Sequence, residues 1–197
     1  NNTKGDFGMA NLYLQYSPVS WISIRSTFSP RVSSSKNGIF NGSLTQTNQG
    51  QLASASVDNR QSLGYIMDNI LTINKEIKEH SFAFTGLYSL QQDESERNSS
   101  AVNDLPFASG WYNLGSSTNR TNISSAYNKF TITSYMARLN YSFQNKYLVT
   151  LANRWDGSSK LSEGHKWATF PSAAVAWRIS QEDFFQNINV ISDLNLR

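Results

Sequence analysis

Residues 130–180 alternate between more apolar and more polar side chains in three successive runs that are separated by polar breaks. A period of two predicts a β-strand with two unlike faces. Each run is longer than the roughly five or six residues usual in a globular sheet, and is long enough to cross a bilayer as a tilted strand of about ten residues. The more apolar face is predicted to carry Thr131, Thr133, Tyr135, Ala137, Leu139, Tyr141 and Phe143 in the first run, Tyr147, Val149, Leu151 and Trp155 in the second, and Trp167, Thr169, Pro171, Ala173, Val175, Trp177 and Ile179 in the third.

Aromatic side chains gather at both ends of these runs. Tyr141, Phe143, Tyr147 and Trp177 flank the short break, whereas Trp155 and Trp167 flank the longer one. Two aromatic belts around an apolar band are typical of an outer-membrane β-barrel. An aromatic-rich antiparallel sandwich is the soluble alternative.

The three runs are predicted to be consecutive antiparallel strands. Phe143 and Tyr147 share a face only if an odd number of residues separates them, so residues 144–146 are expected to form a three-residue turn. In that register Met136 lies opposite Arg154, and Arg138 lies opposite Ala152.

Four more strands are predicted earlier in the chain, over about residues 8–16, 20–28, 63–74 and 80–91. A tight turn is expected at residues 17–19, because Pro18 fixes its own φ and Ser17 favours turn initiation. Two long polar stretches, residues 29–60 and 92–129, are interpreted as long loops, the first containing strand extensions. Residues 182–191 predict one short helical turn. Short and long connections therefore alternate, as they do in a barrel with short periplasmic turns and long external loops.

Composition adds little chemistry to this pattern. The 197 residues contain no cysteine, which excludes disulfides and cysteine-ligated metals within this stretch. The formal charge of +3 is too small and dispersed to indicate nucleic-acid binding. The start at Asn1 without methionine, and the alternation that begins again before Arg197, lead us to expect a fragment of a longer chain.

Several consecutive motifs resemble the SusC/RagA family of TonB-linked outer-membrane transporters. The resemblance is dense from about residue 112 onward and diffuse before it. The motifs are Tyr112-Asn113-Leu114-Gly115-Ser116, Ser134-Tyr135-Met136-Ala137-Arg138-Leu139-Asn140-Tyr141, Lys146-Tyr147-Leu148-Val149-Thr150, Arg154-Trp155-Asp156-Gly157-Ser158-Ser159-Lys160, Trp167-Ala168-Thr169-Phe170-Pro171-Ser172 and Ala176-Trp177-Arg178-Ile179-Ser180.

The resemblance implies an all-β fold, a transmembrane antiparallel barrel of which this chain is a fragment. Members have a barrel of twenty-two strands, an N-terminal plug and a lipoprotein lid. Residues 1–197 are then expected to form part of the barrel domain, about seven strands and the start of an eighth, with the plug domain absent. The implied location is the outer membrane of a Gram-negative, Bacteroidetes-like bacterium.

The resemblance also implies partners and a substrate class. A SusD-like surface lipoprotein would deliver a glycan or peptide to the external loops, and TonB would act through the plug. The lipid bilayer is the remaining partner. No catalytic activity, cofactor or nucleic acid is expected. A passive porin-type barrel and a soluble sugar-binding β-sandwich remain the alternative functions.

Three arginines are the first candidate site residues. Arg138, Arg154 and Arg178 fall on the less apolar face of adjacent strands. A charge that faced lipid at the bilayer midplane would cost about 2–4 kcal/mol, so these side chains are expected to face the lumen and to contact the plug. A generic polar barrel interior is the plainer interpretation.

Trp111 and Tyr112 are the second candidates, as a contact for substrate or for the lid, with internal packing as the alternative. The acidic cluster Asp93, Glu94 and Glu96 suggests a glycosidase pair, but a solvated loop tip explains it more simply. His80 and His165 are too isolated to suggest a metal site, and none is predicted.

Overall fold

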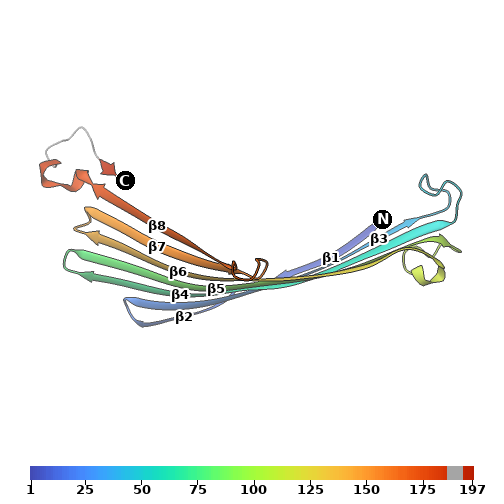
Figure 1. Ribbon diagram of the computed structural model, residues 1–197, viewed down its shortest axis with the longest axis horizontal. Coiled ribbons are helices and arrows are strands. Elements are labelled where there is room, and N and C mark those ends of the chain that lie inside the picture. The colour runs from blue at the N-terminus through green and yellow to red at the C-terminus, as the bar shows by residue number, and fades with distance from the viewer. Residues whose placement is uncertain (186–192) are drawn as a thin grey trace. The chain divides into compact units, whose positions relative to one another are not determined.

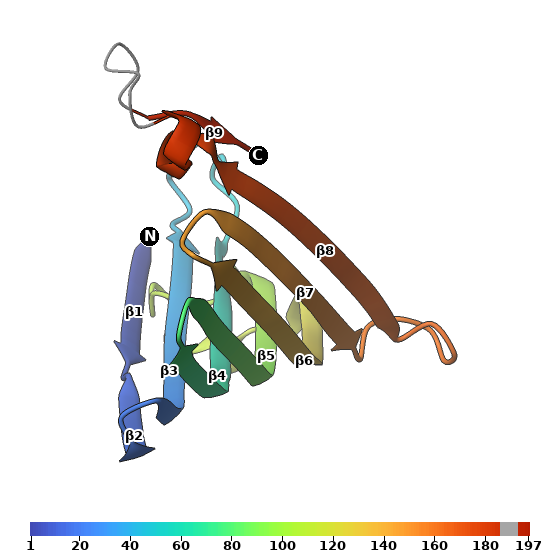
Figure 2. The same cartoon turned by 90° about the vertical axis from the view of Figure 1, so that its left-hand side faces the viewer.

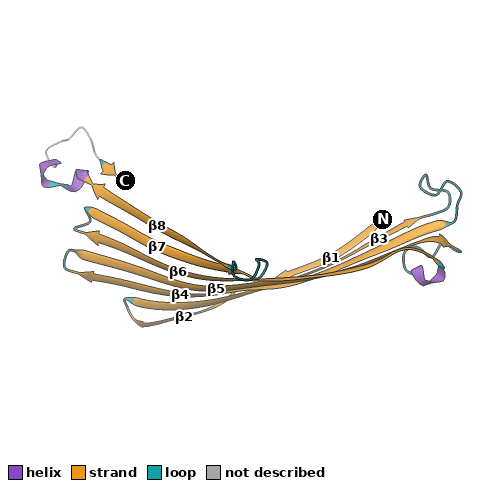
Figure 3. Ribbon diagram, viewed as in Figure 1, coloured by secondary structure: helices purple, strands orange, loops and turns teal. Residues whose placement is uncertain are grey.

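The computed structural model describes residues 1–185 and 193–197, and nearly all of them lie in long strands (Figures 1 and 3). The strands are β1 (Asn2–Met9), β2 (Leu12–Val19), β3 (Ile22–Asn41), β4 (Ala53–Ile77), β5 (His80–Leu105), β6 (Asn119–Phe143), β7 (Tyr147–Ser158), β8 (Trp167–Arg178) and β9 (Asn195–Leu196). Three short 3-10 helices complete the described elements, η1 (Leu114–Ser116), η2 (Ile179–Gln181) and η3 (Asp183–Phe185).

β1 and β2 each pair antiparallel with β3, β6 with β7, β7 with β8 and β8 with β9, and the strands follow the order of the sequence. The sheet order is β1-β3-β4-β5-β6-β7-β8-β9, and β2 also pairs with β3. From β3 onward this meander needs only hairpin connections, because neighbouring strands are consecutive in the chain. The predicted all-β antiparallel fold is confirmed.

The chain divides into two compact units. Unit 2 comprises residues 11–28, 66–91 and 131–197, and in it β6, β7 and β8 lie side by side (Figure 2). Hydrogen bonds join its successive short turns: Asn74 donates to the Trp21 carbonyl, Gln144 to that of Glu79, and Arg178 to that of Lys146. The short turns of unit 2 therefore lie at one end of its strands.

Unit 1 comprises residues 1–10, 29–65 and 92–130, and holds the connections that follow β3 and β5. Residues 42–52 join β3 to β4, and residues 106–118 join β5 to β6. A small hydrophobic cluster packs beneath the second connection. Its buried members are Ala53, Ala55, Val102, Leu105 and Trp111.

The prediction of a long polar loop is wrong over most of residues 92–129, whereas the strand extensions predicted within residues 29–60 are present and take up most of that stretch. β3 continues to Asn41, β4 begins at Ala53, β5 continues to Leu105 and β6 begins at Asn119. Ladder hydrogen bonds satisfy the backbone of a strand whatever its side chains are. A strand with polar side chains on both faces has no hydrophobic alternation, so its period could not be read from the sequence.

The first hairpin also differs from the prediction. β1 and β2 occupy the region of the first predicted strand and are separated at Ala10 and Asn11. The tight turn falls at Ser20 and Trp21, not at residues 17–19. Pro18 instead lies at an irregularity of the ladder, where the register shifts between Tyr16 and Val19. A proline tolerates this position because a bulged residue need not donate a ladder hydrogen bond.

The hairpin between β6 and β7 confirms the predicted register. Phe143 pairs with Tyr147, Met136 with Arg154 and Arg138 with Ala152, so residues 144–146 form the three-residue turn. Gln144 and Asn145 take positive φ values of 51° and 56°, and Lys146 N donates to the Phe143 carbonyl at 3.0 Å.

The predicted helical turn at residues 182–191 lies partly within the described chain. The 3-10 helix η3 covers Asp183–Phe185, and residues 186–192 lie outside the described residues. Among the helices of the described chain, none is long and apolar enough to cross a membrane.

Candidate functional site

One face of β6, β7 and β8 is a continuous apolar surface, because the register aligns the alternation of the three strands. Leu139 pairs with Leu151, which pairs with Ala173, and Tyr141, Val149 and Val175 form the next row. Val175 is 68% exposed and Leu151 is 51% exposed. Large exposed apolar areas mark surfaces that meet something other than water.

Aromatic rows border this face at both ends, as predicted. Phe143, Tyr147 and Trp177 form the row at the turn end, with ring centroids 6.3 Å apart at each step. At the other end Tyr135 lies 5.9 Å from Trp167. The rows are separated by the eight residues from Tyr135 to Phe143, roughly 27 Å along the strand and roughly 21 Å across a bilayer at a tilt of about 40°. This spacing suits the apolar band of a membrane barrel.

The opposite face of the same strands carries the three candidate arginines among small side chains. Arg154 Nε donates to Asp156 Oδ1 at 2.8 Å and to Oδ2 at 2.9 Å, and Arg154 Nη2 donates to Ser134 Oγ at 3.1 Å. Asp156 and Ser134 form a cross-strand pair, and Ser134 is buried. The chain itself therefore neutralises Arg154.

Asp156 was missing from the predicted site. A signal for it was present, because Arg154 and Asp156 are two residues apart in a strand and so share a face. Within residues 1–185 and 193–197, no carboxylate lies within ion-pair distance of Arg138 or Arg178. Arg138 is flanked by Ala152, and Ala152 by Ser172, so its neighbours on β7 and β8 are small.

Trp111 and Tyr112 lie together in the connection between β5 and β6, but in different environments. Trp111 is 7% exposed and belongs to the hydrophobic cluster of unit 1, whereas Tyr112 is 71% exposed. The two rings stack with centroids 4.3 Å apart, and Lys36 Nζ lies 5.2 Å from the Trp111 ring. Trp111 is therefore packed internally, and Tyr112 is the member of the pair that can touch another molecule.

The acidic cluster is part of a strand, so the interpretation as a loop tip is wrong. Asp93 and Glu94 lie in β5, where Asp93 forms an ion pair with Arg31, and Glu94 forms one with Lys129 at 3.5 Å. Ion pairs of this kind leave no free carboxylate pair for glycoside cleavage. His80 Nδ1 lies 2.8 Å from Tyr141 Oη within the aromatic row at the turn end. The part of the chain that the structure describes holds no group of metal-ligating side chains.

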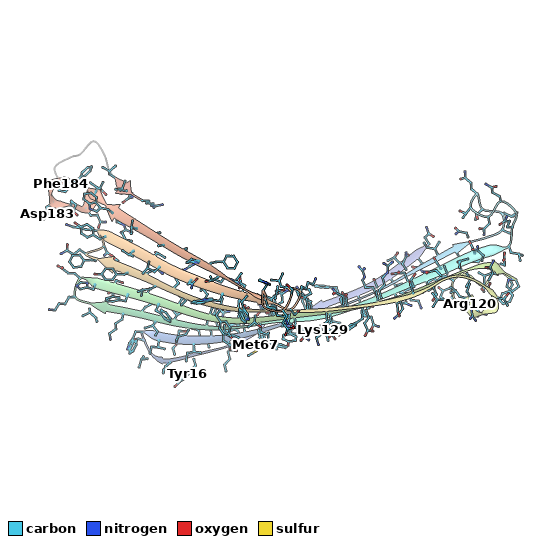
Figure 4. The ribbon with its side chains drawn as sticks, viewed as in Figure 1. Tyr16, Met67, Arg120, Lys129, Asp183 and Phe184 are labelled. Atoms are coloured by element: carbon cyan, nitrogen blue, oxygen red, sulfur yellow. The ribbon has the colours of Figure 1, made fainter. Side chains whose placement is uncertain are left out.

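Sequence reasoning missed the carboxylate at the turn end of β8. Glu182 Oε1 accepts hydrogen bonds from Tyr147 Oη at 2.7 Å and Trp177 Nε1 at 3.0 Å, and Glu182 Oε2 accepts one from Lys146 Nζ at 3.0 Å. The side chains of Glu182 and Lys146 are only 13% and 17% exposed. The neighbouring Asp183 and Phe184 extend beyond the end of β8 (Figure 4).

These hydrogen bonds, the one from Tyr147 most, lower the pKa of Glu182 from 4.5 to about 2. A carboxylate whose pKa is depressed in the folded state stabilises the fold above its unfolded pKa, and this stabilisation is lost as pH falls through the folded pKa. We therefore expect the resistance of the turn end to urea to fall between about pH 4.5 and pH 2. Glu182→Gln should weaken that end at neutral pH and remove this part of the pH dependence.

The measurement is urea unfolding of the detergent-solubilised full-length protein between pH 2 and pH 7, followed by Trp fluorescence. Glu163→Gln is the matched control, because Glu163 is exposed in the connection between β7 and β8 and forms no hydrogen bond or ion pair with a described residue. If Glu163→Gln and Glu182→Gln change the profile equally, the hydrogen bonds to Glu182 do not stabilise the turn end.

Among curated proteins, the chain is similar over its whole length to TonB-dependent receptors. It is 39% identical over 203 aligned positions to TonB-dependent receptor P26 of Formosa agariphila. The aligned region covers 100% of this chain and 20% of that receptor. It is also 54% identical over 67 positions to TonB-dependent receptor SusC of Bacteroides thetaiotaomicron, covering 34% of this chain and 7% of SusC.

Among solved structures, the chain resembles the RagAB peptide transporter with a TM-score of 0.88 and 14% identity, over 98% of this chain and 22% of the RagAB chain. The predicted resemblance to the SusC/RagA family is confirmed. No family model matches the sequence. The segment spans about a fifth of the length of the curated receptors that it matches end to end. The similar proteins are receptors and transporters, not enzymes.

Proposed function

We propose that this SusC/RagA-like segment is part of the membrane-spanning wall of an outer-membrane transporter that imports glycans or peptides. One observation carries the proposal: the register of β6, β7 and β8 places an apolar surface between two aromatic rows on one face, and arginines among small side chains on the other. The apolar face would meet lipid and the arginine face the lumen. A closed barrel is required because backbone polar groups in hydrocarbon must pair with one another.

Unit 2 is the part that would cross the bilayer. Unit 1 carries ion pairs on both faces of its strands, because the adjacent residues Asp93 and Glu94 of β5 point to opposite sides and are paired with Arg31 and Lys129. Charges on both faces suit water on both sides. The strands of unit 1 are therefore expected to extend outside the hydrocarbon region.

Partners and substrate follow from the relatives and remain proposals for this chain. The full protein would combine the barrel domain, of which residues 1–197 are part, with a plug that this segment lacks. TonB would act through the plug, and a SusD-like lipoprotein would bind at the external loops. One similar structure is a peptide transporter, which supports peptides as one substrate class. Similarity to TonB-dependent receptors supports a transporter over a passive porin or a soluble sugar-binding sandwich.

Tyr112 is the proposed contact for the substrate or for the lid. Its exposed ring rests on Trp111, which is held in the hydrophobic cluster. A rigid aromatic ring binds at low conformational cost, because little side-chain freedom remains to be lost. Trp111 acts only by positioning Tyr112.

Cysteine labelling of intact cells tests the topology. The chain contains no cysteine, so a single engineered thiol in it reports one position. Ser162→Cys, in the long connection between β7 and β8, should react with a membrane-impermeant maleimide, and Asn145→Cys, in the short turn, should stay protected until the cells are opened. The reverse labelling pattern would mean that the topology is inverted. Labelling of both cysteines, in a protein that is not found in the membrane fraction, would refute a membrane wall.

A further inference from the structure

A groove of about 620 Å³ crosses the apolar face of unit 2. Its apolar lining consists of Phe84, Ala137, Leu139, Leu151, Pro171 and Ala173. The groove exists because one cross-strand row is small: Ala137 and Pro171 flank position 153 on the two neighbouring strands. Larger side chains, Phe84 and Leu151 among them, form its walls.

Three polar residues, Arg138, Asn153 and Ser172, are among those that line the groove, and of these three Asn153 is the one that falls on the apolar face in the alternation. Asn153 lies on the apolar face of β7, paired with Ala137 and Pro171 and only partly buried. Thr169 Oγ1 donates to Asn153 Oδ1 at 2.9 Å, which engages the amide oxygen and leaves the Nδ2 group as the donor of this side chain. Within residues 1–185 and 193–197, no acceptor bonds this Nδ2 group. An amide donor next to hydrocarbon is costly unless it finds an acceptor.

The depth of Asn153 indicates what that acceptor is. Asn153 is two residues from Trp155, so it lies roughly 7 Å along the strand, and roughly 5 Å along the membrane normal, from the aromatic row that marks the headgroup level. The ester or amide carbonyls of lipids lie just below the headgroups, and their acyl chains continue deeper. Leu139, Leu151 and Ala173 continue the groove in that deeper direction.

We propose that this groove is a specific binding site for a lipid of the surrounding bilayer. The acyl chain lies against Phe84, Leu151 and Ala173, and its carbonyl oxygen accepts a hydrogen bond from Asn153 Nδ2. The inference rests on the proposed membrane-spanning function, because only a wall in contact with lipid presents this face to acyl chains. Thr169 is a positioning residue that holds the Asn153 amide.

The test compares two lipids that differ only in the carbonyl. The full-length transporter, purified in detergent and depleted of lipid, is titrated with palmitoyl-oleoyl phosphatidylethanolamine and with its diether analogue, and bound lipid is counted by native mass spectrometry. The diester is expected to bind about fivefold more tightly, the ratio that one hydrogen bond supplies. Asn153→Leu should remove this preference and leave the acyl-chain contacts.

A matched pair of variants tests the groove itself. Ala173→Phe fills it, whereas Val175→Phe places the same ring on the same face of β8 outside the lining. Ala173→Phe should abolish the tightly bound lipid and Val175→Phe should retain it. If Ala173→Phe does not assemble, the comparison of diester and diether lipids on wild type and Asn153→Leu decides alone.

Equal binding of the two lipids to wild type overturns the proposal. A dimer peak in the mass spectrum of the wild type that is lost in Ala173→Phe also overturns it, because it would assign the groove to a second copy of the chain. Failure of the proposed function looks different. A wild-type protein that is soluble without detergent would refute the membrane wall, whereas a detergent-requiring barrel that retains no lipid refutes only the lipid site.

Discussion

Gly38→Ala is expected to displace Trp111 and to open the connection between β5 and β6. A Cβ atom at position 38 would lie 2.1 Å from Trp111 Cδ2 and 2.2 Å from Cε2, closer than non-bonded atoms approach. The indole cannot move aside cheaply, because Ala55, Val102 and Leu105 pack around it. Loss of a buried Trp from its packing costs about 3–5 kcal/mol, and here most of that cost falls on the local stability of the connection.

The measurement is limited proteolysis of residues 106–118 in the full-length protein, combined with quenching of Trp fluorescence by acrylamide. Gly115→Ala is the control, because a Cβ atom at position 115 meets nothing closer than Asn113 Oδ1 at 3.8 Å. Cleavage should become much faster in Gly38→Ala and remain at the wild-type rate in Gly115→Ala. An unchanged cleavage rate in both would mean that Trp111 does not hold this connection.

Arg138→Leu is expected to impair transport more than the double variant in which Arg154→Leu is combined with Asp156→Asn. Arg138 has no carboxylate partner among the described residues, so in the whole transporter its charge is available to the plug or to an acidic substrate. A charged hydrogen bond is worth about 1.5–3 kcal/mol, so its loss should lower uptake or loosen plug seating about tenfold or more. Barrel assembly should be unaffected, because a lumen-facing leucine costs the sheet little.

Arg154 gives the internal comparison. Arg154→Leu leaves Asp156 unpaired and should also change conductance, whereas the double variant Arg154→Leu with Asp156→Asn removes a neutral pair and should return close to wild type. Single-channel conductance and uptake of a labelled substrate separate these cases, and the heat-modifiability of the barrel on gels reports assembly. If Arg138→Leu transports normally, or if it prevents assembly without changing transport per barrel, Arg138 does not contribute a lumen charge.

The sequence alone was sufficient for the strand pairing of β6, β7 and β8 in unit 2. Alternation from Thr131 to Ile179 has a period of two, and a shift of one residue would turn every apolar side chain to the wrong face. That constraint predicted the pairing of Phe143 with Tyr147, and from it the position of Arg154 opposite Met136. The resemblance to the family was likewise readable from consecutive motifs in this half of the chain.

Only the tertiary structure decided the rest, because the deciding contacts join residues that no local pattern relates. The polar strands of unit 1 carry no alternation, so pairing, and not propensity, makes residues 29–41 strand. Trp111 reaches back to Gly38 in β3, and Glu182 reaches Tyr147 and Lys146 across a hairpin. The sequence does not tell whether an aromatic ring or a carboxylate is packed or free, because this depends on which distant groups the sheet brings beside it. The register and the connections together decide which groups those are.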